Sequence, residues 1–170
     1  MLFRSWKEDL LLEESRSAAQ LLAEALDGRG DGEVTIDVLE GTSASLRNTE
    51  RDAEELRLCR LKYQILAAEP RLHGHEMVDF SEHLRPALVA GYSCDLRSAG
   101  VADAESFAGI LAGLTNGALI EEMNVYRASV LRGTVDADLP NLAVLRAAIF
   151  ANLRDAFRTF SAPGGGSGTS

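Results

Sequence analysis

All three histidines of this chain lie within the stretch HGHEMVDFSEH, residues 73–83. If this segment is helical, His75, Asp79 and His83 lie at positions i, i+4 and i+8 on one face, and Glu76 borders that face. Residues four apart on a helix are about 5–6 Å apart at Cβ, so adjacent pairs can share one ion. A mixed nitrogen and oxygen ligand set suits zinc, iron or manganese better than calcium. The spacing therefore predicts a site for a divalent transition metal, with these ligands: His75, Glu76, Asp79 and His83.

The same letters are also typical of a solvent-exposed polar helix face. His75 and His83 are separated by roughly 12 Å of helical rise, which is too far for both to bind one ion unaided. Glu121 and Glu122 could supply further ligands from a facing helix. However, the usual carboxylate-bridged site carries Glu-x-x-His on two helices, and here no glutamate lies three residues before any histidine. The opposite side of the segment carries hydrophobic residues, as on an ordinary amphipathic helix: Met77, Phe80 and Leu84.

The stretch FSEHLRPAL, residues 80–88, resembles the H-box of sensor histidine kinases, in which a phospho-accepting histidine precedes a Leu-Arg pair and a proline on a helix. The resemblance implies that His83 is the accepting imidazole, followed by Leu84 and Arg85, and that Pro86 is the helix-kinking proline. The acidic residue precedes His83 instead of following it, Pro86 comes one position early, and no glycine-rich ATP lid follows. The resemblance thus implies a phosphotransfer-type helical protein that uses His83 and has no kinase activity.

The stretch DGRGDGEVTIDV aligns with a calcium-binding EF-hand loop, with Asp27 and Asp31 at two ligand positions. Arg29 stands where the loop needs a third oxygen ligand, and Val38 replaces the bidentate glutamate. A solvent-exposed Asp/Gly turn that leads into a strand explains the same letters.

Signatures of common enzyme classes are absent from the sequence, which contains no GxSxG, GxxxxGK[ST] or GxGxxG pattern. We therefore expect a non-catalytic regulatory or interaction module that binds a small ligand or a protein partner. Gly109, Gly113 and Gly117 recur at intervals of four residues. Small residues on one helix face leave room for a ligand or let another helix pack closely.

The spacing of hydrophobic residues predicts an all-α fold, a single-domain bundle of five or six helices over residues 1–160, followed by a flexible Gly/Ser-rich tail at residues 161–170. Leu58, Leu61, Ile65 and Leu66 form the hydrophobic stripe of one helix. The first expected helix occupies residues 5–26, and the second runs from a capping box at Thr49 to Pro70. The third begins at residue 73, and Pro86 kinks or splits it. The fourth lies between Asp103 and Gly133, and the last runs from Asp138 to residue 160.

Residues 33–39 are the exception, because Val34, Ile36 and Val38 alternate with polar residues. Alternation with a period of two predicts a short β segment. A single strand without a mate in the chain exposes an edge that natural proteins seldom leave open. Pairing with the same strand of a second copy would close that edge, so the sequence predicts a homodimer.

The composition is acidic, with 26 acidic against 17 basic residues and a formal net charge of −9. This charge disfavours binding to nucleic acids and to anionic membrane surfaces. Cys59 and Cys94 form no CxxC pattern, and the first residues soon become acidic, unlike a signal peptide. We therefore expect a cytoplasmic protein without disulfides.

Overall fold

Six helices make up the fold. The computed structural model describes residues 6–47 and 52–161, without the side chains of residues 6–8, 10 and 47, and within these residues it contains helices and no strand. The helices are α1 (Trp6–Asp27), α2 (Thr35–Arg47), α3 (Ala53–Ala68), α4 (Pro70–Ser98), α5 (Ala104–Arg132) and α6 (Val135–Ser161). The predicted all-α bundle is thus confirmed. None of the described helices is long and apolar enough to cross a membrane.

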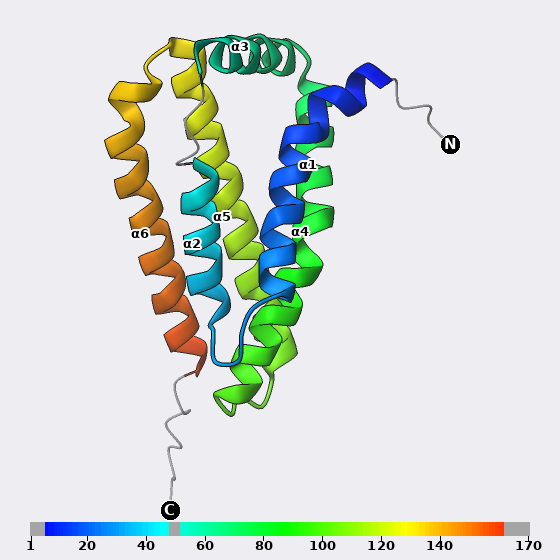
Figure 1. The fold of residues 1–170 in the computed structure, drawn as a ribbon. Coiled ribbons are helices and arrows are strands. Elements are labelled where there is room, and N and C mark those ends of the chain that lie inside the picture. Colours follow the sequence, from blue (N-terminus) through cyan, green and yellow to red (C-terminus); the bar gives the residue numbers. More distant parts are fainter. Residues whose placement is uncertain (1–5, 48–51, 162–170) are drawn as a thin grey trace, which may run out of the picture.

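Five helices run side by side, whereas α3 lies across one end of the bundle (Figure 1). The central helix α5 packs against α4 and α6, α1 packs against α4 and α2, and α3 packs against α5 and α4. The main core contains large aromatic side chains, and Phe80, Tyr92 and Phe150 are each at most 1% exposed. The Tyr92 and Thr115 hydroxyl oxygens are 2.7 Å apart. Burial of Tyr92 in this core raises the pKa of its phenol to about 12.

Several helix ends follow the rules that the sequence suggested. Asp52 and Glu55 form a capping box at the start of α3, whereas the predicted cap Thr49 lies outside the described residues. Gly133 ends α5 in the left-handed conformation, as predicted. Pro86 does not split its helix, because α4 is continuous through it. Pro86 is exposed, so water can solvate the carbonyl that loses its helical partner.

The predicted β segment at residues 33–39 is wrong, because the chain is helical from residue 35 onward. Ile36, Leu39 and Ser43 are buried at spacings of three and four, which is a helical pattern that the shorter valine alternation obscured. The start of α2 is capped by Asp95 of α4, whose carboxylate accepts a hydrogen bond of 2.8 Å from the Thr35 backbone N–H. The strand edge that supported the homodimer prediction does not exist, so that prediction stays untested and without its original reason.

The start of helix α2 lies close to α4 at Gly91. A methyl group at this position would lie 2.6 Å from Thr35 Oγ1 and 3.2 Å from Thr35 Cγ2. Thr35 cannot easily move away, because the Arg29 guanidinium donates to its hydroxyl at 2.5 Å and also pairs with Asp95 at 3.1 Å. The absence of a side chain at Gly91 therefore allows the two helices to meet.

The variant Gly91→Ala should lower the free energy of unfolding by about 1–3 kcal/mol, because it overpacks this contact. Urea denaturation checks this value. Gly113→Ala in α5 is the matched control, since nothing lies within 4 Å of its added methyl group. Alanine is the better helix former, so the control should gain about 0.5–1 kcal/mol. A Gly91→Ala variant as stable as the wild type would contradict the close approach.

Candidate ligand-binding cavity

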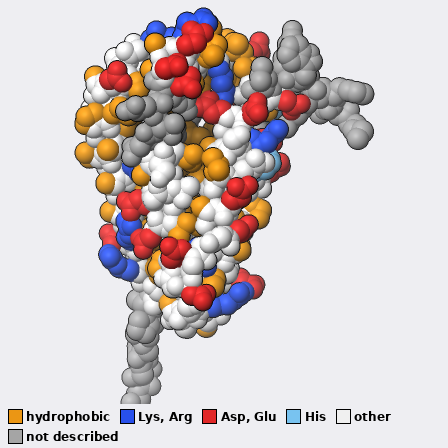
Figure 2. All heavy atoms as spheres, viewed as in Figure 1, with side chains coloured by type: hydrophobic (Ala, Val, Ile, Leu, Met, Phe, Trp, Pro, Cys, Tyr) orange, Lys and Arg blue, Asp and Glu red, His pale blue; other side chains and the backbone are white. Residues whose placement is uncertain are grey.

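A cavity of about 270 Å³ lies inside the bundle below α3, and five helices contribute to its wall. The space-filling view shows hydrophobic side chains in a hollow between α1 and α2 (Figure 2). Leu21, which lines the cavity, is 47% exposed, so the cavity is open to solvent on this side. The lining residues are Glu14, Ser15, Ser17, Ala18, Leu21 and Leu22 of α1, Ser43 and Leu46 of α2, Tyr63 of α3, Phe80 of α4, and Leu119, Glu122, Met123, Tyr126 and Arg127 of α5.

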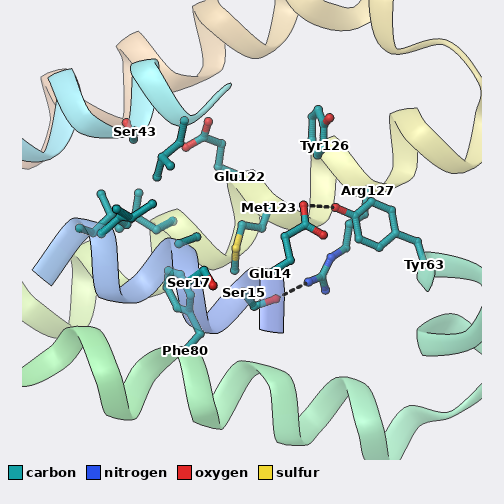
Figure 3. Close-up of a pocket in the computed structure, with 15 residues that line it drawn as sticks. Glu14, Ser15, Ser17, Ser43, Tyr63, Phe80, Glu122, Met123, Tyr126 and Arg127 are labelled. Carbon is teal, nitrogen blue, oxygen red and sulfur yellow. Dashed lines mark hydrogen bonds between the residues drawn. The ribbon is translucent and has the colours of Figure 1, made fainter. Parts of the chain in front are cut away.

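The wall is hydrocarbon in one part and polar in another. Leu22, Phe80 and Leu119 are each at most 4% exposed and make a buried apolar surface. Figure 3 shows Tyr63 and Arg127 beside each other at one end of the cavity. This combination of apolar surface with a few charged and hydroxyl groups is typical of sites that bind small molecules.

A buried ionic cluster supports the polar end and joins three helices. Glu76 of α4 is fully buried, and its Oε1 accepts hydrogen bonds from the Ser15 hydroxyl of α1 and from Arg127 Nη2 of α5, the latter at 2.5 Å. Arg127 Nη1 also lies 3.2 Å from His73 Nδ1. The Glu76 Oε2 atom is buried and has no hydrogen-bond partner. Arg127 is therefore the arginine that pairs with the buried Glu76 carboxylate, and His73 Nδ1 lies 3.6 Å from Oε2.

Two further ion pairs flank the cavity. Lys62 Nζ of α3 lies 2.9 Å from Glu14 Oε2 of α1, and Arg146 Nε of α6 lies 2.8 Å from Glu122 Oε1 of α5. Glu122 is 3% exposed, so water screens its interaction with Arg146 only weakly. These pairs connect α3 and α6 to the helices that line the cavity.

The structure does not bring the predicted metal ligands together. His75 is exposed, and His83 lies with its Nδ1 2.7 Å from the backbone oxygen of Asp79. The Asp79 carboxylate is buried against α1, where Arg16 Nε lies 2.8 Å from it and the hydrogen bond raises the pKa of Arg16. Glu76 pairs with Arg127. Among the described residues, no group of three or more His, Cys, Asp or Glu side chains could hold a metal ion.

The metal hypothesis has a direct test. A transition metal would have to displace Arg16 from Asp79 and Arg127 from Glu76, so we expect EDTA to leave the melting temperature unchanged. An ion that binds only the folded chain, at a hundred times its Kd, would add about 2.7 kcal/mol and raise the melting temperature of a chain of this size by roughly 5–10 °C. Differential scanning calorimetry with and without chelator checks this. A chelator-sensitive transition that His83→Ala abolishes would support the metal site instead.

The phosphotransfer hypothesis for His83 remains untested. His83 is half-buried, and its Nδ1 is held by the Asp79 backbone, so its Nε2 is the nitrogen left for phosphorylation.

The EF-hand alignment has no support in the described loop, since Arg29 turns inward to Asp95. Of the three aligned glycines, Gly113 and Gly117 are exposed on α5 and none lines the cavity.

Sequence reasoning missed the residues that matter most at the polar end. Ser15 lies in the buried stripe of α1 between Leu12 and Ala19, and Arg127 lies in that of α5. A polar residue inside a hydrophobic stripe was the available signal, because such a group must find a partner when it is buried. The identity of that partner depends on how helices pack, which periodicity does not reveal.

Fold and site define an all-helical bundle, within the described residues, with an amphipathic cavity of about 270 Å³. Comparison with models of protein families, with curated proteins and with solved structures finds no match for this chain.

Proposed function

We propose that this protein is a non-catalytic helical module that binds a small amphipathic molecule in the cavity between α1, α2 and α5. The observation that carries the proposal is the cavity of about 270 Å³ whose wall changes from leucine and phenylalanine side chains to charged ones. A hydrocarbon body would replace water against Leu22, Phe80 and Leu119, and a polar head would reach the charged end.

The size of the cavity limits the ligand. Sites for drug-sized ligands span about 300–1,000 Å³, and this cavity lies just below that range. A ligand of about six to ten non-hydrogen atoms suits the space better than a lipid or a nucleotide. Binding would hold α1, α2 and α5 together, so the ligand would raise the free energy of unfolding of the bundle.

Methionine methyl groups provide a probe for this proposal. Met123 lines the cavity and is 9% exposed, whereas Met77 of α4 does not line it. In a protein with 13C-methyl methionine, 1-hexanol should shift the Met123 resonance in a saturable manner and leave Met77 unchanged. Met123→Leu assigns the resonance.

A cavity-filling variant provides the control. Ala18→Phe should fill the space and abolish the hexanol-dependent shift, because Ala18 lines the cavity. Gln20→Phe places the same ring at an exposed position of α1 and should leave binding intact. Absence of a saturable Met123 shift in the wild type, or an equal shift in Ala18→Phe, would refute ligand binding in this cavity.

A further inference from the structure

We propose that the ligand of this cavity is a small organic amine, bound as an ammonium ion with its hydrocarbon body among the leucines. This inference rests on the proposed function, since it assigns a head group to the ligand of the same cavity. Two carboxylates from different helices, Glu14 of α1 and Glu122 of α5, line the cavity. An ammonium has three N–H donors and a positive charge, and its hydrogen bonds to carboxylates are charge-assisted and short.

In each flanking ion pair, the acidic residue lines the cavity and the basic residue does not. Glu14 and Glu122 line the cavity, whereas their cationic partners Lys62 and Arg146 do not. The Glu14 carboxylate also accepts a hydrogen bond of 3.5 Å from the Tyr63 hydroxyl (Figure 3). A ligand head group would thus add a donor to carboxylates that already have partners. This arrangement favours a donor over an acceptor as the head group.

The cation that does line the cavity, Arg127, is already engaged. It donates to Glu76 at 2.5 Å, and its Nη2 also lies 3.5 Å from the Ser15 hydroxyl. A ligand carboxylate would compete for Arg127 with Glu76, which is fully buried. Loss of the partner of a buried charge is costly, so this competition disfavours an anionic ligand.

One acceptor atom behind the polar end has no hydrogen-bond partner among the described residues. The buried Glu76 Oε2 has no hydrogen-bond partner, although it belongs to the same cluster as Ser15 and Arg127, which line the cavity. Glu76 itself does not line the cavity, so a bound water and not the ligand would have to donate to this atom, whereas a ligand carboxylate near the cluster would add another acceptor.

Aromatic rings at the polar end also suit a cation. The Tyr63 ring already attracts two cationic groups of the protein, with Arg127 Cζ 5.2 Å and Lys62 Nζ 5.8 Å from its centroid, so a ligand cation would share this end of the cavity with them. Tyr126 adds a second ring to the lining. Aromatic faces attract cations through the ring quadrupole. The net charge of −9 further raises the local concentration of cations near the protein.

Three ligands of equal length test the head group: hexylammonium, 1-hexanol and hexanoate, each titrated at pH 7 against the Met123 methyl resonance. We expect hexylammonium to bind about tenfold more tightly than 1-hexanol, and hexanoate to bind more weakly than either. Hexanoate binding as tightly as hexylammonium, or equal affinities for all three ligands, would overturn the inference and leave the proposed function standing. If none of the three binds, the proposed function itself fails.

Adjacent glutamates of α5 supply a matched pair of variants. Glu122 lines the cavity and is 3% exposed, whereas Glu121 is exposed. Glu122→Gln should reduce the preference for hexylammonium over 1-hexanol by about threefold or more, and Glu121→Gln should leave it unchanged. Retained binding of 1-hexanol shows that the Glu122→Gln cavity is intact. An unchanged preference in Glu122→Gln would contradict the role of this carboxylate.

Discussion

Replacement of Arg127 by alanine is expected to lower the free energy of unfolding by about 3–5 kcal/mol. Arg127 Nη2 lies 2.5 Å from Oε1 of Glu76, a residue with 0% exposure. Without the guanidinium, the Glu76 carboxylate would remain buried with the Ser15 hydroxyl as its hydrogen-bond donor and without a strong cation beside it. Removal of one member of a buried ion pair is costly because the other charge stays out of water. Urea denaturation measures the loss.

Two comparisons separate this effect from loss of side-chain volume. Arg132→Ala in the same helix removes an arginine that is 58% exposed and pairs with Asp138 at the surface, so stability should not change measurably. The double variant Glu76→Leu with Arg127→Met should recover most of the stability, because it removes both charges and keeps the volume. An Arg127→Ala variant no less stable than Arg132→Ala would show that the buried ion pair contributes little.

The helical nature of the bundle could be predicted because long helices carry their own signal. Hydrophobic residues at spacings of three and four mark the buried faces of α1, α4 and α6, and these faces do form the core. Local chemistry also predicted ends such as Gly133, since a left-handed terminal residue favours glycine wherever the helix lies. These features depend on neighbours within one or two turns.

Features that depend on distant residues could not be predicted in the same way. Helix α2 begins where Asp95, 60 residues away, caps Thr35, so its first turn looked like a strand when read alone. The stripe expected to bury α3 is largely exposed, with Leu58 at 53% and Ile65 at 45%. Of its members Leu66 is buried, together with Tyr63, which was not expected. Because α3 crosses the end of the bundle, its buried face is set by α4 and α5.

The candidate site also combines local features, which the sequence could predict, with contacts between helices, which it could not. Glu76 and Asp79 lie on one helix, but they are buried and not part of a solvent-exposed polar face, because α1 and α5 bring arginines against both carboxylates. A carboxylate beside an arginine is a structural ion pair, whereas the same carboxylate beside histidines is a candidate metal ligand. Sequence spacing describes one helix at a time and cannot distinguish the two.

The second large effect is expected for Phe80→Ala, which should lower the free energy of unfolding by about 3–5 kcal/mol. Phe80 is 1% exposed. Its side chain belongs to the main core and also lines the cavity, so it separates the two. Its removal would enlarge the cavity with an apolar space that water fills poorly. For a chain of this size the melting temperature should fall by roughly 6–20 °C.

The control and a rescue experiment connect this prediction to ligand binding. Val78→Ala in the same helix removes an apolar side chain that is 55% exposed and should change stability little. Toluene should raise the melting temperature of Phe80→Ala more than that of the wild type, since an enlarged apolar cavity binds small aromatic molecules. If Phe80→Ala melts like Val78→Ala, the aromatic wall between core and cavity does not exist as described. Rescue by toluene that Ala18→Phe blocks would instead show that the apolar wall and the ligand site form one continuous space.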